Sequence, residues 1–483
     1  MTDRADELHR LFIGGEWVQG AAALSDANPS NLAEPVGQYA QGDASHIAAA
    51  VDAAVSAAPV WRASTPQQRF DVLDFVGSEI LRRREELGRL LAREEGKVLP
   101  EAVAEVTRAG YIFKFFAGEA LRAGGEHIPS VRPGIMVDTM REPLGVVGLI
   151  TPWNFPIAIP AWKTAPALAF GNTVVLKPAE IVPGCAWALA EIISRSGLPS
   201  GVFNLVMGKG SVLGDALTSH PSVAGISFTG SAAVGATVAS RSAARLARVQ
   251  LEMGGKNPLV IIDDADVAVA VNAAVNGAYF STGQRCTASS RFIVTAGIHD
   301  RFIAAMVERL RSLKVDDALA PGTDIGPVVD PSQLEKDMSY IDIGRHEGAT
   351  LIFGGERLKR STEGYFLSPA LFTGTSPAMR INREEIFGPV AGIIRVRDYE
   401  DALAVANDTP YGLCAGICTT SLKHAHHFAA NAQAGMVMVN LPTAGVDYHV
   451  PFGGKKGSSY GTREQGRYAV EFYTTVKTCY TAP

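Results

Sequence analysis

Hydrophobic positions recur at helical spacing in the first third of the chain. Segment 43–61 is rich in alanine and begins with an Asp and a Ser that are typical of a helix cap. Segment 69–97 has the same spacing, with its cations concentrated toward the end. Both segments therefore predict helices.

From Gly145 the pattern changes to short apolar runs that alternate with helical stretches. The runs are GVVGLIT, NTVVLKPAE, GVFNLVMG and VAGISFTG, and the helical stretches include CAWALAEIISRSG and GSVLGDALTSH. Strands that alternate with helices favour a parallel, doubly wound sheet. This part of the chain therefore predicts one α/β unit.

A second α/β unit is predicted after the segment LEMGGKNP. There LVIID and SRFIVT have strand character, whereas 266–280 and 299–315 have helical spacing, and Asp300 is expected to open the second helix. Gly254 and Gly255 are placed to form a hinge between the two units. A chain of 483 residues is too long for one hydrophobic core, so two or three domains are expected.

The chain predicts a subunit interface but no membrane span. The final segment, VEFYTTVKTCYTAP, has strand propensity and no partner strand nearby in the sequence, and such a strand often pairs with another subunit. The longest uncharged run, 145–162, is interrupted by three prolines and an asparagine. That run therefore predicts a buried strand followed by a loop.

Composition and charge narrow the class of protein. Apolar residues make up 47% of the chain and charged residues 19%, which is typical of a globular, core-rich protein. A formal charge of −5 leaves no basic surplus for binding nucleic acid. Five cysteines at low density favour a reducing compartment, and the charged start, 1–10, lacks an apolar signal core, so a cytoplasmic location is expected.

One cysteine differs from the others in its surroundings. Cys286 lies among small polar residues in AYFSTGQRCTASSR. The other four cysteines lie in segments that are typical of ordinary packed structure. The neighbours of Cys286 leave room around its thiol and supply hydrogen bonds. From the residues alone, Cys286 is either a nucleophile or an inert buried cysteine.

Four further motifs follow predicted strands, and open α/β sheets bind their ligands at the carboxyl ends of strands. These motifs are TPWNFP, LKPAE, FTGSAAVG and LEMGGK. In FTGSAAVG, the run from Gly230 to Gly235 would either present helix N–H groups to a pyrophosphate or form a tight turn. In LKPAE, Glu180 would either accept hydrogen bonds from ribose hydroxyls or form a solvated pair with Lys177.

Seven motifs resemble, in order and spacing, those of the NAD(P)-dependent aldehyde dehydrogenases. They are TPWNFP, LKPAE, FTGS…VG, LEMGGKNP, STGQRC, EEIFGPV and PFGGKKGS, and the resemblance runs from about residue 11 to residue 478. It implies an α/β fold with a Rossmann-type cofactor domain, an α/β catalytic domain and a small β oligomerisation element in a homodimer or homotetramer. The implied bounds are 1–120 with 144–253 for the cofactor domain, 254–457 for the catalytic domain, and 121–143 with 458–483 for the oligomerisation element.

The resemblance implies a set of catalytic residues. Cys286 would attack an aldehyde to give a thiohemiacetal and then a thioester, and its thiolate would be favoured by Arg285, by bound nicotinamide and by N–H dipoles. Asn154 would hold the oxyanion, or else cap a proline-rich loop. Glu252 would activate the hydrolytic water with a raised pKa, or else form a hinge salt bridge with Lys163 or Lys455. Lys163 also matches a lysine of the family's active site.

The resemblance also implies a cofactor, NAD with NADP as the alternative, and the residues that would contact it. Glu180 favours NAD, because an acidic group repels a 2′-phosphate. Glu384 replaces Glu385 if the register of EEIFGPV is shifted by one. No metal site is expected. The implied cofactor residues are Thr151, Trp153, Lys177, Glu180, Gly230, Ser231, Gly235, Glu385 and Phe387.

The substrate is expected to be a small acidic semialdehyde. An unpaired buried Arg285 would be costly, so it would pair with an acidic substrate or with a protein carboxylate. The segments around Cys286 and at 439–478 resemble the 2,5-dioxopentanoate (α-ketoglutaric semialdehyde) dehydrogenases. Succinate or glutarate semialdehyde, a broad range of aldehydes, esterase activity and a non-catalytic role are the alternatives. The implied substrate-binding residues are Arg285, Phe155, Ile159, Trp162 and Phe452.

Overall fold

The computed structural model describes residues 8–483, and most of its strands lie in two large sheets. Most of the charged start, on which the expectation of no export signal depends, lies outside the described residues. The first sheet has eight strands in the order β20-β12-β11-β8-β9-β10-β2-β3. Their bounds are Ser459–Tyr460, Arg248–Met253, Val223–Gly230, Val146–Ile150, Thr173–Lys177, Phe203–Leu205, Leu11–Ile13 and Glu16–Val18.

The helices around this sheet follow the predicted pattern, with one break. Asp43 caps α1 in a capping box with His46, as the sequence of segment 43–61 predicts. The single predicted stretch 69–97 is two helices, α2 and α3, which meet at Arg83, where the backbone angles of φ −96° and ψ 13° interrupt the helix; both helices pack on α4 and α6. The bounds are α1 Ala44–Arg62, α2 Pro66–Arg82, α3 Arg84–Glu95, α4 Leu99–Ala120, α5 Ala158–Ala169, α6 Gly184–Ser194, α7 Gly210–Ser219 and α8 Ala232–Ala244.

The second large sheet has seven strands in the order β15-β16-β17-β14-β13-β18-β19, all parallel except β15. Helix α10 begins one residue before Asp300, which lies in its first turn rather than at its cap. The strands are Thr350–Phe353, Ala370–Thr375, Val390–Val396, Ser289–Thr295, Asn257–Ile261, Cys414–Cys418 and Met436–Val439, and the helices are α9 Val267–Tyr279, α10 His299–Arg311, α11 Pro331–His346, α12 Arg380–Arg383, α13 Tyr399–Asn407 and α14 Leu422–Asn431.

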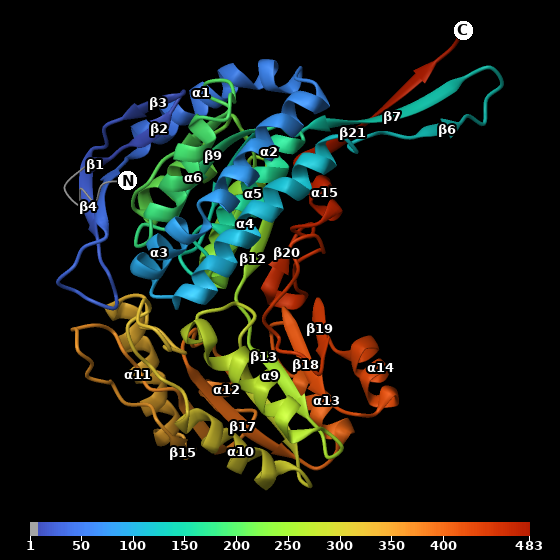
Figure 1. Cartoon of the computed structure of the whole chain (residues 1–483). Coiled ribbons are helices and arrows are strands. Elements are labelled where there is room, and N and C mark those ends of the chain that lie inside the picture. The colour runs from blue at the N-terminus through green and yellow to red at the C-terminus, as the bar shows by residue number, and fades with distance from the viewer. Residues whose placement is uncertain (1–7) are drawn as a thin grey trace.

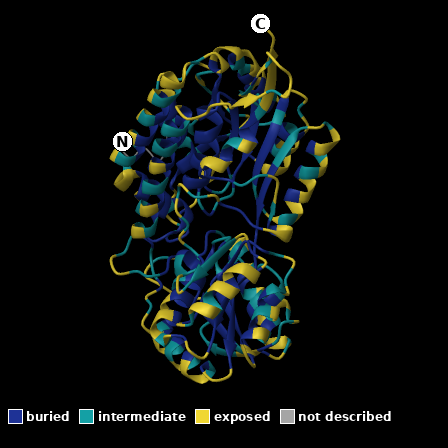
Figure 2. Ribbon diagram, turned by 90° about the vertical axis from the view of Figure 1, so that its right-hand side faces the viewer, coloured by how far each residue is buried: buried dark blue, intermediate teal, exposed yellow. Residues whose placement is uncertain are grey.

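The two sheets are set end to end. Strand β12 ends at Met253, and only three residues separate it from the start of β13 at Asn257. The carboxyl ends of β8, β9, β11 and β12, which are mutually parallel, therefore face the amino ends of β13, β14 and β17. Figure 1 shows the two bodies joined by this run, and Figure 2 shows that each has its own buried interior. The predicted hinge at Gly254 and Gly255 thus lies where the two bodies meet.

A third sheet projects from the first body and contains the final strand (Figure 1). Strand β21, Thr474–Thr481, pairs antiparallel with β7, Met136–Pro143, which in turn pairs with β6, His127–Pro129. The final strand therefore has a partner within its own chain, far away in the sequence. The preceding residues Val470–Tyr473 form the short helix α15 instead of extending the strand.

A fourth, smaller sheet consists of β1 Leu8–His9, β5 Gly37–Gln41 and β4 Ala22–Asp26 and lies beside the first body (Figure 1).

The long uncharged run 145–162 forms strand β8, a turn and the first part of helix α5. The expected strand is present, but the loop is short, because the helix begins at Ala158. Across residues 8–483, no helix combines the length and the apolar character that crossing a bilayer needs.

Candidate active site

Cys286 lies in a tightly turned segment before the amino end of β14. The tight turn, η1, is at Phe280–Gly283, just before the cysteine. Its backbone departs from helical angles, because Ser281, Thr282 and Gly283 have positive φ values of 51°, 56° and 68°. A Cβ on Gly283 would lie 2.4 Å from the carbonyl oxygen of Gly388, so only glycine fits there. Backbone strain of this kind persists where the surrounding structure holds it, as at functional sites.

Asn257 holds the backbone at the cysteine and just after it. Its Nδ2 donates to the carbonyl oxygens of Cys286 at 2.8 Å and of Ala288 at 2.9 Å, and its Oδ1 accepts from the backbone N–H of Cys414. The sequence analysis quoted Asn257 within LEMGGKNP but gave it no role. A buried asparagine at the start of a strand was the available signal.

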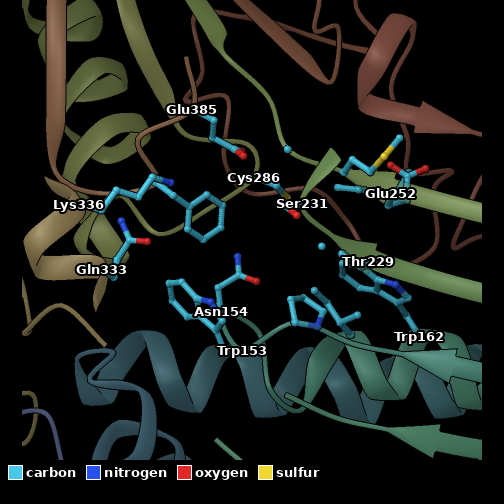
Figure 3. Close-up of a pocket in the computed structure, with 17 residues that line it drawn as sticks. Trp153, Asn154, Trp162, Thr229, Ser231, Glu252, Cys286, Gln333, Lys336 and Glu385 are labelled. Atoms are coloured by element: carbon cyan, nitrogen blue, oxygen red, sulfur yellow. The ribbon is translucent and has the colours of Figure 1, made fainter. Parts of the chain in front are cut away.

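The first of two pockets at Cys286 lies between the two bodies (Figure 3). Asn154, Cys286 and Glu385 converge on one space, with Glu252 on one side and Gln333 and Lys336 on the other. Six further residues line the pocket but were not predicted as site residues: Pro152, Thr229, Met253 and Gly254 lie within the quoted motifs, whereas Gln333 and Lys336 lie on α11, which carries no recognisable motif. The predicted residues that line this pocket are Trp153, Asn154, Ile159, Trp162, Gly230, Ser231, Glu252, Cys286, Glu385, Phe387 and Phe452.

A second pocket opens on the other side of the cysteine. Its volume is about 310 Å³, within the range of small-molecule sites. Cys286, Trp162 and Phe452 line both pockets, whereas Phe155 and Arg285 line only the second. All five predicted substrate-binding residues therefore lie in one or both pockets. Helix α4 contributes a further polar wall to the second pocket, which the sequence analysis did not identify.

Asn154 is held beside Cys286 from two directions. Its side-chain Nδ2 donates to the carbonyl oxygen of Gln284 at 2.9 Å, and its own carbonyl oxygen accepts from Lys97 Nζ at 2.8 Å. Lys97 is itself paired with the buried Glu105 at 2.6 Å. The amide of Asn154 keeps a second N–H for a ligand in the first pocket. Loop capping alone does not describe this position, because both contacts fix the amide near the thiol.

Glu252 is buried and has one free carboxyl oxygen. Its Oε2 accepts from Ser459 Oγ at 2.6 Å, whereas Oε1 has no hydrogen-bond partner among the described residues. Burial, and then the charge of Glu464, raise the pKa of Glu252 well above its usual value. Neither Lys163 nor Lys455 forms an ion pair with Glu252 within the described chain. The alternative of a hinge salt bridge is therefore not what the structure contains.

Lys163 does not line either pocket. It is fully buried behind Glu252, where its Nζ donates to Glu464 and, at 2.8 Å, to Ser227 Oγ. Trp162, which lines both pockets, donates from Nε1 to the same Glu464 at 2.6 Å. The structure therefore gives Lys163 a role in balancing buried charge rather than direct contact with a ligand.

The thiol of Cys286 is protonated in the free protein. Burial, followed by the carboxylates of Glu385 and Glu252, raises its pKa to about 12. Arg285 does not lower this pKa, because its guanidinium pairs with Glu101 at 2.8 Å. The expected help from Arg285 is therefore absent. Forming the thiolate requires either a base or a cationic ligand beside it.

The residues at the carboxyl ends of β8 and β9 fit an oxygen-rich ligand. The ammonium of Lys177 is buried and makes no hydrogen bond within the described chain, and burial lowers its pKa to about 8. Glu180 accepts from the backbone N–H of Gly210 at 3.1 Å and stays at the surface of the same strand end. The hydroxyls of Thr151 and Thr229 are buried without partners. Such unsatisfied donors are the groups that ribose and phosphate oxygens would satisfy.

Gly230, Ser231 and Gly235 shape the start of α8 after β11. Ser231 caps the helix by accepting from the backbone N–H of Val234 at 3.4 Å. Gly235 lines neither pocket. It lies on the side of α8 that packs against β12, where a Cβ would be 2.4 Å from Met253 Sδ. It lets α8 pack close to β12, so that the free N–H groups of the helix start face the first pocket.

Glu385 rather than Glu384 faces the first pocket. Glu385 accepts from the backbone N–H of Gly255 at 2.9 Å, and a Cβ on Gly254 would lie 2.0 Å from its Oε2. Glu384 points away and pairs with Arg380. Close approach therefore requires Gly254, which the sequence analysis interpreted only as a hinge.

Phe387 lines the same wall from the second body. It has a φ of 69° and lies edge-on to Trp153, with ring centroids 5.3 Å apart.

The site as a whole is a thiol between two pockets, flanked by an amide and a buried carboxyl group. This arrangement fits an enzyme that brings two ligands to one nucleophilic cysteine.

Comparison with known proteins identifies the family. The model of the Aldehyde dehydrogenase family matches residues 17–479. The alpha-ketoglutaric semialdehyde dehydrogenase of Bacillus subtilis (strain 168) is 43% identical over 477 residues, or 98% of each chain. The alpha-ketoglutarate semialdehyde dehydrogenase of Haloferax volcanii is 45% identical over 487 residues, or 99% of each chain. A crystal structure of betaine aldehyde dehydrogenase from Staphylococcus aureus with NAD⁺ matches at a TM-score of 0.95 and 35% identity, covering 98% of this chain and 95% of that one.

The chain belongs to the aldehyde dehydrogenase family and is an oxidoreductase that acts on aldehydes. The resemblance drawn from seven motifs is thereby confirmed, as is the expected α/β fold. The bounds of the three implied domains and the roles of individual site residues stay predictions.

We expect alkylation of Cys286 in the free protein to be slow near neutral pH and to accelerate as the pH rises. A pKa of about 12 leaves little thiolate at about pH 7, and the fraction grows tenfold per pH unit below the pKa. Peptide mass spectrometry after timed exposure to iodoacetamide would measure this, with the exposed Cys479 as internal control. A rapid reaction at Cys286 that does not change between about pH 6 and pH 9 would contradict the assigned protonation state.

Proposed function

We propose that this chain oxidises a small acidic semialdehyde to a carboxylate with NAD, and that the substrate is 2,5-dioxopentanoate, giving 2-oxoglutarate. The observation that carries the proposal is the position of Cys286 between two pockets, the second of which is lined by three cationic side chains and two carboxylates and so carries a net positive charge. The names of the Bacillus and Haloferax relatives support the same substrate. A carboxylate on the substrate would be attracted into such a pocket.

NAD is assigned to the first pocket and to the strand ends beside it. When bound, it supplies the acceptor for the hydride that leaves the aldehyde carbon. The start of α8 at Ser231 would hold the pyrophosphate, and Lys177 with Glu180 would hold the adenosine ribose. Glu385 and Phe387 would hold the nicotinamide end. Glu180 favours NAD over NADP because its carboxylate would lie near a 2′-phosphate.

Acylation takes place at Cys286 with the help of the groups around it. The thiol releases its proton to solvent, the sulfur attacks the aldehyde carbon, and the resulting alkoxide would be held by the amide N–H of Asn154 and the backbone N–H of Cys286. Loss of hydride from that carbon then leaves a thioester on Cys286. The positive charge that a bound nicotinamide brings beside Cys286 would offset the two carboxylates that raise the pKa of the thiol.

Glu252 performs deacylation. Its free Oε1 is placed to take a proton from the water that attacks the thioester carbon, which releases the carboxylic acid and restores the thiol. Burial raises the pKa of this carboxyl group well above its usual value, so its carboxylate is a stronger base, and the proton that it takes then passes to the departing sulfur. A glutamate at this position supports hydrolysis over transfer to coenzyme A.

Succinate and glutarate semialdehyde, or a broad range of aldehydes, are the alternatives within the same reaction. A non-catalytic role would predict damage at Cys286, Asn154 or Glu252, and all three are present and converge on one pocket. Esterase activity would use the same thiol without NAD, so a requirement for NAD separates it from the main proposal.

The sheet β21-β7-β6 is proposed as the oligomerisation element. Its strands come from the segment 121–143 and from the end of the chain. The two large sheets are proposed as the cofactor and catalytic domains, with the boundary at residue 253. The apolar side chains of Val476 and Tyr480 on β21 are 58% and 62% exposed, as expected of a strand covered by another subunit. A homodimer or homotetramer would bury them.

We expect purified protein to form NADH faster with acidic semialdehydes than with pentanal. The comparison uses 2,5-dioxopentanoate, succinate semialdehyde and pentanal, and measures initial rates by absorbance with NAD and with NADP. A favourable charge pair in the pocket should raise kcat/KM for the best acidic substrate by about 30-fold or more. Equal rates for all three aldehydes would refute the acidic substrate, and no NADH from any aldehyde would refute the dehydrogenase activity.

We expect Glu252→Gln to trap the thioester on Cys286. The amide cannot activate water, so one equivalent of NADH should form rapidly and steady turnover should fall by about 10²- to 10⁴-fold. Stopped-flow absorbance measures the burst. Glu384→Gln, on the exposed side chain that pairs with Arg380, is the matched control and should keep full turnover. Loss of the burst together with turnover would assign Glu252 to acylation instead.

We expect Val476→Glu to shift the protein to a smaller assembly. The substitution places a charge on the exposed apolar face of β21, and burying that charge in an interface would be costly. Multi-angle light scattering after size exclusion measures the mass. Leu422→Glu, at an even more exposed apolar position on α14, is the control. An unchanged mass in both variants would place the interface elsewhere.

A further inference from the structure

Three cationic side chains line the second pocket, and two of them are neutralised by the protein. Lys97 pairs with Glu105 at 2.6 Å, and Arg285 pairs with Glu101 at 2.8 Å. The third, Arg108 on α4, has no carboxylate within 4.0 Å among the described residues. The pocket therefore carries one positive charge that the described chain leaves without an anionic partner.

The hydrogen bonds of Arg108 are incomplete. Its Nη2 donates to Gln465 Oε1 at 2.9 Å, and its Nε is buried without any partner. Its guanidinium carbon lies 5.7 Å from the ring centroid of Trp162, so the ring supports one face of the group. Glu105, which pairs with Lys97, and Asp447, on an exposed loop, are close enough to raise the pKa of Arg108, but neither forms an ion pair with it.

Arg69, another partly buried arginine, has a structural role and finds its hydrogen-bond partners within the chain. Arg69 donates to the carbonyl oxygens of Trp61 and Arg62 and to Ser64 Oγ, which satisfies its guanidinium within the chain. Arg108 has only the amide oxygen of Gln465. Burial lowers the pKa of Arg108 to about 10, so it still carries its charge at neutral pH. A charged, desolvated group with one neutral partner is costly unless a ligand completes its contacts.

Arg108 shares its pocket with the nucleophile. Cys286, Trp162 and Phe452 line the second pocket together with Arg108, and the Cys286 sulfur is close enough to affect the pKa of Arg108. An aldehyde carbon at Cys286 and a carboxylate at Arg108 can therefore belong to one short molecule lying along the face of Trp162.

We propose that Arg108, and not Arg285, binds the distal carboxylate of the substrate and sets the preference for acidic aldehydes. The proposal rests on the function proposed above, since it requires an acidic substrate. The free N–H groups of the guanidinium offer the two-pronged contact that a carboxylate accepts, and Gln465 and Trp162 hold the group in place.

Arg285 has a different task in the same pocket. The carboxylate that it pairs with, Glu101, also accepts from the backbone N–H of Ser281 at 3.0 Å and from Ser281 Oγ at 2.9 Å. Arg285 itself donates to Ser281 Oγ at 2.8 Å and to the carbonyl oxygen of Asn276 at 3.3 Å. These contacts hold the strained turn that leads to Cys286, so Arg285 is a positioning residue that acts on every aldehyde alike.

The test compares Arg108→Met with Arg285→Met, two substitutions that keep much of the apolar stem and remove the charge. Each variant is assayed with NAD, 2,5-dioxopentanoate and pentanal, which both have five-carbon chains. For Arg108→Met we expect kcat/KM with 2,5-dioxopentanoate to fall about 30-fold or more, mainly through KM, and kcat/KM with pentanal to stay within about twofold. For Arg285→Met we expect both substrates to lose activity by the same factor, mainly in kcat.

Arg108→Lys and thermal unfolding separate binding from structure. Lysine keeps the charge but not the fork, so part of the preference for the acidic substrate should return. If Arg108→Met is unstable, Arg108→Gln takes its place, and activity with pentanal reports whether the site is intact. The proposal is overturned if Arg108→Met weakens both substrates equally, or if Arg285→Met is the variant that selectively loses the acidic one.

An error in the proposed substrate would give a different result from an error in the role of Arg108. If the unmodified enzyme shows no preference for 2,5-dioxopentanoate over pentanal, then the acidic substrate itself is wrong, and Arg108 has no substrate carboxylate to bind. If the unmodified enzyme has the preference and Arg108→Met keeps it, only the role of Arg108 is wrong.

Discussion

The three residues between β12 and β13 impose the constraint on which the site depends. They carry the chain directly from the carboxyl end of one parallel sheet to the amino end of the other, so the loops at both ends must share one narrow space. The first sheet contributes Asn154, Ser231 and Glu252 to this space, and the second contributes Cys286 and Glu385. Gly254 permits the closest approach, because any side chain there would displace the carboxylate of Glu385.

The same geometry explains why so many charged groups are buried near the cysteine. Each body closes the other's strand ends against water, which raises the pKa values of Cys286 and Glu252. Isolated buried charges are costly, so the chain pairs Lys163 with Glu464 and Lys97 with Glu105. Among the described residues, Arg108, which lines the second pocket, has no such carboxylate partner, and a ligand there can supply the missing contacts.

Motifs along the sequence predicted the family, the α/β fold and most residues of the first pocket, because these residues lie in short segments at strand ends. Positions that depend on distant partners were not predictable. Arg108 lies in the middle of an ordinary helix, and only the packing of α4 against the loop of Cys286 brings it into the second pocket. The sequence pointed to Arg285 because it adjoins Cys286, but its partner Glu101 lies far away along the chain. The strand that pairs with β21 was missed for the same reason.

The most direct measurement is a crystal structure of Cys286→Ala with NAD and 2,5-dioxopentanoate. Removing the sulfur prevents acylation without filling either pocket. The account predicts the nicotinamide beside Glu385 and Phe387, the aldehyde carbon next to position 286, its oxygen toward the amide of Asn154, and the carboxylate on Arg108. NAD in the second pocket, or a substrate carboxylate bound away from helix α4, would contradict the arrangement of one cysteine between two separate ligand sites.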